Sequence, residues 1–441
     1  MKLPKYDEAR LDYTDLQPRN YSGYFFNKNP FPALPVAEEE PGIFIDREKI
    51  VKNLSDVTKE VFVTKKTQTL VLQGLYGSGK SHTLKYVKSR VNRQLATLQK
   101  SKGIAVYAQS PGSDIRHFYS NVVDDLGMQF LQIQAYQVIW DFLKRNPQSI
   151  EANFFDEELG NKVKSLLSSE RDETPFLREN FDSSGVRILD VYADIKQELG
   201  PKVRLDDALT AFLNLTNEDK IFLAWRWLLG ENLRSDERKD LGVSKNLEES
   251  DDILKGFAAL KTLLAMTGFD TLFILVDEFE KISELHPLSK SRYFDDFRHF
   301  IDLNPEGLCI ILCVTPTGWA EIQSAGHPLA RRLMTNVNWL EPFGLEETIR
   351  LIKAHVETER GQFGENQGIT DNDLIGQIKA KDAKHPDIYP FTPDSIQMIQ
   401  ELSAGVVSEI LRICKILIDA GCDEGCKPLS GVITKKILSI S

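Results

Sequence analysis

The feature that most constrains this chain is the stretch of residues 74–81, which reads Gly-Leu-Tyr-Gly-Ser-Gly-Lys-Ser. It is a complete phosphate-binding loop of the form G-x-x-x-x-G-K-S/T, which requires a buried strand before it and a helix after it. The apolar run 69–72 predicts that strand, and apolar residues from Leu84 to Leu98 recur at helical spacing. The sequence therefore predicts an α/β fold with an anion site where the strand passes into the helix.

The residue types in this loop suit the binding of a nucleotide. Glycine at three positions allows successive backbone N–H groups to converge on phosphate oxygens, and the start of the helix adds its dipole. We expect Lys80 to reach the β- and γ-phosphates of ATP and the Ser81 hydroxyl to ligate Mg²⁺. The predicted nucleotide-binding residues are Gly74, Leu75, Tyr76, Gly77, Ser78, Gly79, Lys80, Ser81 and His82.

A second apolar strand pattern, residues 271–276, ends in the acidic pair Asp277 and Glu278. This is a Walker B pattern, in which the first acid holds Mg²⁺ and the second polarises the water that attacks the γ-phosphate. We therefore assign Asp277 to the metal, through water, and Glu278 to the general base. Glu280 is a weaker candidate that we expect to be solvated. An acidic pair that only ends the strand is the alternative interpretation.

A third apolar run, residues 308–314, ends in Thr315-Pro316-Thr317 and predicts the next core strand. We expect its terminal hydroxyl to lie between the two Walker motifs, where it could orient the attacking water or sense the γ-phosphate. Thr315 is the first candidate and Thr317 the reserve. A threonine that simply ends a strand before proline explains either residue equally well.

Composition indicates a large chain of two or three structural units, with 441 residues of which 41% are hydrophobic and 27% charged. We expect a cytoplasmic protein, because no apolar run is long enough to span a membrane and the N-terminus lacks a signal-peptide core. Two of the five cysteines lie in the third core strand, which suits a reducing compartment. Cys422 and Cys426 have no second pair or nearby histidine, so a zinc site is not expected there.

The net charge of −11 opposes nucleic acid, so any DNA contact must be local. A basic stretch runs along and after the phosphate-loop helix, and the simplest interpretation is a solvated helix face. Its residues are Lys85, Lys88, Arg90, Arg93, Lys100 and Lys102.

Four segments follow from composition and periodicity. Residues 1–45 are proline-rich and predict an extended N-terminal arm along the core. Residues 46–345 form the nucleotide-binding core, interrupted at about 130–265 by a helical insert that buries the aromatic segment 220–229. Within the insert, the acidic stretch 235–240 predicts an exposed loop. Residues 346–441 form a helical lid and a short tail, with a helix start at 392–394.

A further apolar run at residues 103–109 predicts a strand between the phosphate loop and the Walker B pattern. Taken in order, the first strand, the phosphate loop, this strand, the Walker B pattern, the polar strand end and the helical lid resemble an AAA+ ATPase. The stretch Phe44-Ile-Asp-Arg-Glu-Lys-Ile50 resembles the F-x-x-R-E box of ORC/Cdc6-like and STAND-like members, where it borders the adenine. The loop through His82 is similar to the G-x-Y-G-x-G-K-S/T-H of ATP-binding proteins of bacterial and archaeal phage-exclusion (BREX-type) systems. Segments 224–230 and 241–243 resemble the helical insert of that group.

The AAA+ resemblance implies a P-loop NTPase with a central parallel sheet, a long helical insert and a C-terminal α-helical lid. It makes residues 327–333 resemble the box that ends in an arginine finger, with Arg332 as the finger and Arg331 in reserve. Such an arginine meets charge developing on the γ-phosphoryl oxygens, usually across a subunit interface. A surface pair after a helix is the alternative. At the sensor-2 position of the lid, this chain departs from the pattern with Ser408, although Arg412 one turn later could substitute.

These residues predict a switch or assembly ATPase that binds and hydrolyses ATP with Mg²⁺. Its expected role is that of a helper in DNA-related antiviral defence or genome maintenance, as a homo-oligomer or in a hetero-complex with a defence or DNA-processing effector. One alternative is a replication-initiator or transposition-type DNA-loading ATPase, which the ORC-like box favours and which the acidity and the expected absence of a winged-helix domain oppose. The other is a non-hydrolysing nucleotide-dependent scaffold, which the absent sensor-2 arginine favours and the intact Asp277 and Glu278 oppose.

Overall fold

The computed structural model describes residues 19–32, 42–45, 48–98, 101–146, 191–324, 328–334, 336–381 and 384–439. The chain divides into two compact units. One comprises Ala37–Glu341, and the other joins Met1–Val36 to Pro342–Ser441.

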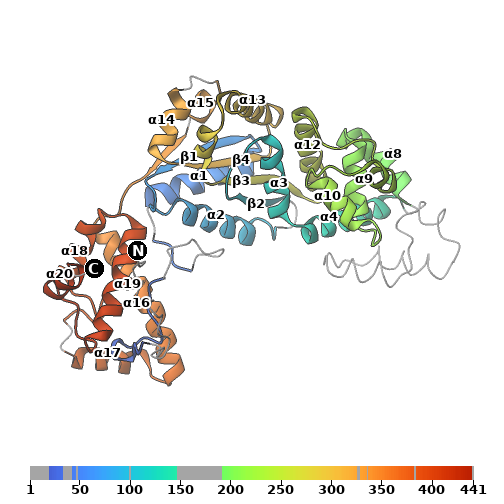
Figure 1. Cartoon of the computed structure of the whole chain (residues 1–441). Coiled ribbons are helices and arrows are strands. Elements are labelled where there is room, and N and C mark those ends of the chain that lie inside the picture. The colour runs from blue at the N-terminus through green and yellow to red at the C-terminus, as the bar shows by residue number, and fades with distance from the viewer. Residues whose placement is uncertain are drawn as a thin grey trace, which may run out of the picture. The chain divides into compact units, whose positions relative to one another are not determined.

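The first unit is built on a sheet of five strands (Figure 1). Their order is β2-β3-β4-β1-β5, and all four strand pairings are parallel, as the apolar runs predicted. The strands are β1 (Gln68–Gly74), β2 (Lys102–Ala108), β3 (Phe269–Val276), β4 (Leu308–Val314) and β5 (Val337–Leu340).

Alternate residues of the strands bury opposite faces of the sheet, which gives the unit three layers. On one face, Leu70 and Leu72 of β1 share a core with α1 (Glu48–Thr64) and α2 (Lys80–Gln94). On the other face, Val71 of β1 belongs to a larger core. The helices of that face are α3 (Ile115–Leu126), α12 (Ser250–Met266), α13 (Pro287–Leu303), α14 (Pro316–Ser324) and α15 (Pro328–Leu333). Figure 1 shows the strands between α2 and α13 to α15.

The predicted helical insert lies between α3 and β3, and residues 147–190 of it fall outside the described part of the chain. Its apolar residues, including the fully buried Trp227, continue the larger core of the sheet. In the aromatic segment 220–229, Ala224, Trp227 and Leu228 are buried, and further apolar residues pack partly buried against the core. Phe222 is 70% exposed. The described helices of the insert are α4 (Met128–Arg145), α8 (Tyr192–Val203), α9 (Asp206–Asn214), α10 (Ile221–Leu228), α11 (Ser235–Leu241) and α12.

The second unit is helical. Its α18 begins at Pro393 after Thr392, which confirms the helix start predicted at 392–394. Asp394 also links the start of this helix to α20. One of its carboxylate oxygens accepts a 2.7 Å hydrogen bond from the amide of Gly431, the first residue of α20. The helices of this unit are α16 (Leu345–Gln367), α17 (Asp371–Ala380), α18 (Pro393–Ser403), α19 (Val407–Asp423) and α20 (Gly431–Leu438).

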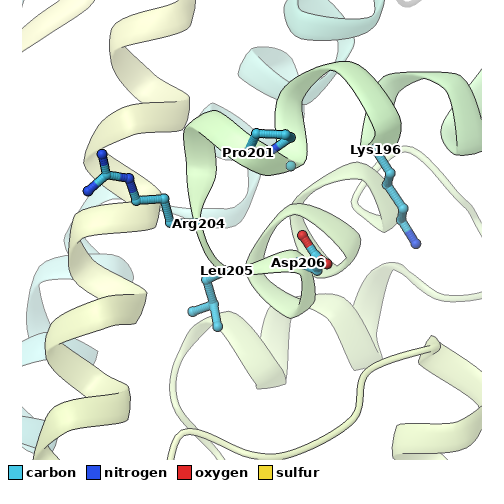
Figure 2. Close-up of a pocket in the computed structure, with 6 residues that line it drawn as sticks. Lys196, Pro201, Arg204, Leu205 and Asp206 are labelled. Atoms are coloured by element: carbon cyan, nitrogen blue, oxygen red, sulfur yellow. The ribbon is translucent and has the colours of Figure 1, made fainter.

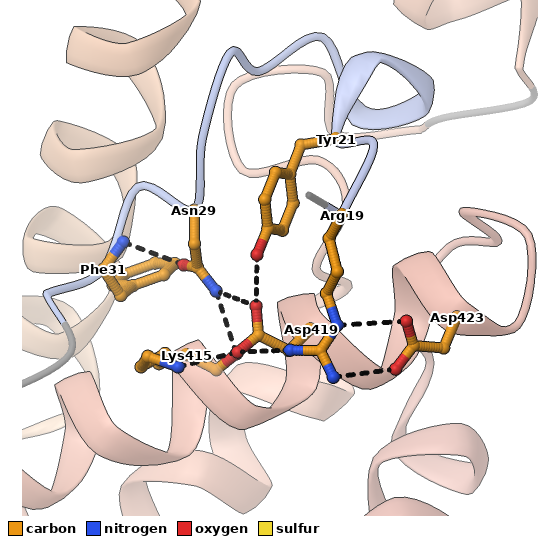
Figure 3. A network of polar contacts seen from close by, with 7 residues as sticks. All are labelled: Arg19, Tyr21, Asn29, Phe31, Lys415, Asp419 and Asp423. Carbon is orange, nitrogen blue, oxygen red and sulfur yellow. Dashed lines mark hydrogen bonds and ion pairs between the residues drawn. The ribbon is translucent and has the colours of Figure 1, made fainter. Parts of the chain in front are cut away.

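The N-terminal segment 19–32 packs into this helical unit rather than along the sheet (Figure 3). The carboxylate of Asp419 in α19 accepts hydrogen bonds of 2.7 Å from the Tyr21 hydroxyl and from the Asn29 amide. Arg19 pairs with Asp423 in the same helix at 3.1 Å. Four aromatic side chains of the segment are buried, namely Tyr24, Phe25, Phe26 and Phe31. The segment is therefore an integral part of the C-terminal helical unit.

Among the helices of the described residues, we find none that combines the length and the apolar character needed to cross a bilayer.

Candidate functional site

The two Walker motifs and the predicted sensor strand meet at one edge of the sheet. In a parallel sheet the carboxyl ends of the strands share an edge, and ligands bind in the crevice beyond it. β4 lies between β1 and β3. Thr315, which follows β4, therefore lies between the phosphate loop after β1 and Asp277 after β3, which is where the sequence placed it.

The phosphate loop has the backbone shape that an anion site requires. Gly77 and Gly79 take positive φ values of 74° and 95°, a region that glycine enters without strain. Gly79 is also the N-cap residue of α2, so the first amides of that helix face the loop. A Cβ on Gly74 would lie 2.6 Å from the Ser78 Oγ, so this position needs glycine for close packing.

Lys80 is buried at the start of α2, with 9% of the residue exposed. Its Nζ donates hydrogen bonds of 3.0 Å to the backbone carbonyls of Gly74 and Leu75. The ammonium thus stabilises the loop through these two carbonyls. It lies close to the positions that the phosphates would take.

The segment before α1 lies along α2, one turn beyond the phosphate loop. The Ile43 carbonyl is 2.7 Å from the His82 Nε2, and the Phe44 ring stacks on Tyr86 with centroids 3.9 Å apart. Phe44 is the first residue of the box that was predicted to border the adenine. Residues 46 and 47 of that box lie outside the described residues.

Asp277 is buried at the end of β3, and both of its carboxylate oxygens accept hydrogen bonds. The Glu278 amide donates to Oδ1 at 2.9 Å, and the Tyr107 hydroxyl donates to Oδ2 at 2.9 Å. Tyr107 therefore holds one of the two residues that were predicted to bind the metal.

Burial and the adjacent Asp277 carboxylate raise the pKa of Tyr107 well above its ordinary value, so the phenol stays protonated as a donor. Sequence reasoning missed this residue, because a tyrosine in an apolar strand is also an ordinary β-former. The available signal was its place near the carboxyl end of β2, the neighbour of β3.

The donor set fits Mg²⁺. Among the described residues, no group of three or more His, Cys, Asp or Glu side chains could hold a metal by itself. The site instead offers one hydroxyl, from Ser81, and one carboxylate, from Asp277. Both are hard oxygen donors, and Mg²⁺ characteristically takes one or two carboxylates and completes its shell with water and substrate phosphates.

Glu278 has a strained backbone and a solvent-facing carboxylate. Its φ of 46° is left-handed, a conformation that costs a non-glycine residue about 1–3 kcal/mol. Its side chain is 41% exposed and pairs with Lys281, which raises the pKa of that lysine. Its role as general base stays a prediction.

Glu280 was expected to be solvated, and this expectation is wrong. Its Oε2 is buried and has no hydrogen-bond partner among the described residues. Its side chain packs against Gly318 of α14 so closely that a Cβ added there would lie 2.1 Å from the Glu280 Cβ. The same point would lie 3.1 Å from the Thr315 Oγ1. A second carboxylate therefore lies against the segment that follows the sensor strand.

Thr315 caps α14, since its Oγ1 accepts a hydrogen bond of 3.2 Å from the Gly318 amide. This is the chemistry of a threonine that ends a strand, and its O–H remains a donor. Thr317 is exposed. A role for Thr315 towards the attacking water or the γ-phosphate stays a prediction.

Arg332 lies in α15, at the opposite end of the sheet from the phosphate loop. Its backbone carbonyl accepts a 3.3 Å hydrogen bond from the Thr69 hydroxyl near the start of β1, about 16 Å along the strand from Gly74 at 3.3 Å per residue. Its guanidinium pairs with Asp302 at 2.7 Å and is half exposed. An arginine in this place could reach only the nucleotide of another subunit. Arg331 is also exposed, and residue 327 of the predicted box lies outside the described residues.

The predicted sensor-2 region belongs to the helical unit. Arg412 of α19 is exposed and pairs with Glu409 at 2.8 Å, one turn earlier in the same helix. Ser408 is half-buried near the start of that helix. Their coupling to a nucleotide stays a prediction.

The basic stretch on α2 makes contacts within the molecule. Lys88 pairs with Asp125 of α3 at 2.7 Å, while Lys85 lies over the Tyr107 ring and Arg90 over the Tyr86 ring. Lys102 lies over Phe269. These contacts favour the structural interpretation of the stretch over a DNA-binding surface.

A separate open hollow of about 480 Å³ lies in the insert, between α8 and α9, and touches none of the strand ends (Figure 2). Burial lowers the pKa of Lys196 on its wall. The lining residues are Lys196, Gly200, Pro201, Arg204, Leu205 and Asp206.

Residues 179–343 match a family model described as BREX system ATP-binding protein BrxC/D. The match confirms the resemblance to BREX-type ATP-binding proteins that the loop and the insert predicted. It runs from the insert through β3, β4 and β5, and therefore covers Asp277, Thr315 and Arg332 but not the phosphate loop. No curated protein matches the sequence.

Proposed function

We propose that the protein is an AAA+ switch or assembly ATPase that binds and hydrolyses Mg·ATP as a component of a BREX-type phage-defence system. The observation that carries this proposal is that the two predicted Walker motifs follow parallel strands of one sheet and meet at the same edge. Asp277 follows β3, the phosphate loop follows β1, and β4 lies between these two strands. The family match supports the system to which the activity would belong.

In this proposal the loop amides and the start of α2 receive the triphosphate, whose negative charge suits the helix dipole. The Lys80 Nζ would exchange the two loop carbonyls it now contacts for β- and γ-phosphate oxygens, a stronger, charge-assisted pairing. Mg²⁺, when bound, neutralises charge on these oxygens. Ser81 and Asp277 are the residues that would hold it.

Hydrolysis would use the polar ends of β3 and β4. A water that attacks the γ-phosphorus must give up a proton, and Glu278 is the proposed acceptor. Its carboxylate would have to leave Lys281 to reach this water. Thr315 would orient the water, and Arg332 of a neighbouring protomer would meet the charge on the γ-phosphoryl oxygens. This arrangement makes the complete site a property of the assembly.

One second candidate has a specific observation behind it. Glu278 is paired with Lys281, and Ser408 occupies the sensor-2 position, so a nucleotide-dependent scaffold that does not hydrolyse ATP is the alternative. The two candidates predict equal ATP binding and differ in turnover.

Calorimetry with ATP and Mg²⁺ tests the proposal. We expect the wild type to bind ATP, and we expect Lys80→Ala to lose measurable binding because it removes the buried ammonium. Lys59→Ala, which removes an exposed lysine from α1 of the same unit, is the matched control and should bind like the wild type. Unchanged affinity in Lys80→Ala would remove Lys80 from the site. Absence of phosphate release from a wild type that binds ATP would select the scaffold.

A further inference from the structure

We infer that Tyr107 is a positioning residue for the metal site, because its hydroxyl fixes the Asp277 carboxylate. This inference rests on the proposed binding of Mg·ATP. It assigns to Tyr107 no contact with the nucleotide and no part in proton transfer.

The two predicted metal residues come from elements that do not pair with each other. Asp277 follows β3, whereas Ser81 lies in α2, which follows β1, and β4 separates the two strands. With neighbouring strands about 4.8 Å apart, β1 and β3 are roughly 10 Å from each other. The orientation of the Asp277 carboxylate therefore affects its distance from the Ser81 hydroxyl.

The Tyr107 side chain holds that carboxylate. Its hydroxyl donates to Asp277 Oδ2 at 2.9 Å. With the Glu278 amide on Oδ1, the carboxylate is held at both oxygens and cannot rotate without breaking a hydrogen bond. Each oxygen keeps a lone pair for a metal-bound water.

Tyr107 is itself firmly held. Its backbone amide donates to Asp125 Oδ2 at 2.9 Å, and Asp125 Oδ1 receives Lys88 of α2 at 2.7 Å. The Lys85 Nζ lies 5.4 Å from the centre of the Tyr107 ring. The helix that carries Lys80 and Ser81 thus contacts both the ring of Tyr107 and the residue that anchors its backbone. Movement of α2 would be transmitted to Asp277 through this tyrosine.

The inference predicts a change in the affinity for Mg²⁺ and no change in the affinity for ATP without metal. Residues that hydrogen-bond a metal ligand from behind typically change metal affinity by about 10–100-fold when they are mutated. Tyr107→Phe removes only the hydroxyl and leaves the ring beneath Lys85. ATP binding without metal should therefore be unchanged, while the Mg²⁺ requirement should rise.

The experiment measures the affinity of the intact protein for ATP by fluorescence or calorimetry, in EDTA and across a series of Mg²⁺ concentrations. We expect Tyr107→Phe to need about tenfold more Mg²⁺ for the half-maximal effect. In EDTA its affinity should stay within about twofold of the wild type, since a metal-bound ligand is what the hydroxyl serves. Tyr192→Phe is the matched control, because it removes a buried hydroxyl bonded to the Leu213 carbonyl in the insert.

A double mutant separates positioning from general packing. If Tyr107 acts through Asp277, then Tyr107→Phe should have little further effect on the Mg²⁺ requirement in an Asp277→Asn background. Additive effects, an unchanged Mg²⁺ requirement, or a lower requirement in the single variant would each overturn the inference. The last result would mean that the hydroxyl competes with the metal. A wild type that binds no ATP at any Mg²⁺ concentration would instead overturn the proposed function.

Discussion

The two glutamates that follow Asp277 differ in their surroundings in a way that bears on which of them would activate water in the proposed reaction. Glu278 occupies the usual position for the base, but its carboxylate faces solvent and pairs with Lys281. Glu280 is partly buried, and its Oε2 is buried without a hydrogen-bond partner among the described residues. A buried oxygen without a partner is costly, which makes Glu280 the second candidate for the base.

We expect Glu278→Gln to keep its affinity for ATP and to lower turnover on the order of a hundredfold, the scale of a lost general base. The measurement is phosphate release at saturating ATP, together with calorimetry. Glu284→Gln, an exposed position in the same short helical turn, is the control and should behave like the wild type. If Glu278→Gln keeps turnover within about threefold while Glu280→Gln loses it, the base is Glu280.

Gly74 gives a second test at the scale of one residue. We expect Gly74→Ala to weaken ATP binding and to destabilise the protein by about 1–3 kcal/mol, because the new methyl group would meet Ser78 Oγ at 2.6 Å and Leu340 Cβ at 3.0 Å. Binding and thermal unfolding report the two effects. Gly361→Ala in α16 has open space around it and should leave ATP binding unchanged. Normal ATP binding by Gly74→Ala would show that the loop accommodates the added methyl group without a loss of affinity.

At the scale of elements, the strongest sequence patterns predicted the sheet well. The uninterrupted apolar runs of β1, β3 and β4 predicted buried strands, because only a strand covered on both faces is apolar at every position. Contacts between distant segments could not be predicted. The hydroxyl of Tyr107 hydrogen-bonds a carboxylate 170 residues further along the chain. Such a contact depends on the strand order, which local periodicity does not specify. The packing of Glu280 against Gly318 could not be predicted for the same reason.

One local prediction was overturned by capping. The acidic stretch 235–240 reads as a loop, yet it forms α11 because the Glu237 side chain accepts a 2.8 Å hydrogen bond from the Arg234 amide and caps the first turn. The packing of the N-terminal segment could not be predicted, because its proline content does not identify a partner. In the described residues 19–32, four of its aromatic side chains are buried in the helical unit.

The docking of that segment leads to a prediction about pH. Burial alone would raise the pKa of Asp419, but hydrogen bonds from Lys415, Asn29 and Tyr21 outweigh it and hold this pKa below its ordinary value. A lowered folded pKa gives stability that is present above the unfolded pKa and is lost as the pH falls through the folded one.

We therefore expect Asp419→Asn to destabilise the protein by about 1–3 kcal/mol at neutral pH. The difference from the wild type should shrink as the pH falls below about 4. Denaturant unfolding followed across pH measures it. Asp423→Asn, at a carboxylate that is 55% exposed, is the control and should cost less than about 1 kcal/mol. A difference that stays constant down to pH 2 would contradict the assignment.

At the scale of the whole molecule, the position of Arg332 makes assembly testable. The residue lies at the end of the sheet away from its own phosphate loop, so a finger role requires a second protomer. ATP that bridges two protomers would favour the assembled state by its differential affinity. We expect wild-type protein to associate more strongly in ATP, as measured by analytical ultracentrifugation.

Arg332→Ala should bind ATP normally and lose both turnover and ATP-dependent assembly. Mixing it with Glu278→Gln should restore part of the activity, since one interface then combines Lys80 and Glu278 of the first subunit with Arg332 of the second. Arg350→Ala, which breaks an exposed pair with Glu347 in α16, is the control. No recovery on mixing, with a monomeric wild type in saturating ATP, would identify Arg332 as a surface partner of Asp302.

The division of the chain into two units also determines the order in which they can fold during synthesis. All five strands of the described sheet have been made once Leu340 is complete, so the unit that contains the sheet can begin to fold while the ribosome is still translating α16. The N-terminal segment, although made first, must wait for α19 to cover Tyr24, Phe26 and Phe31. Until then these aromatic residues form an exposed hydrophobic patch on the nascent polypeptide. A premature stop in the last helices would leave them uncovered and would mark the truncated product for chaperones.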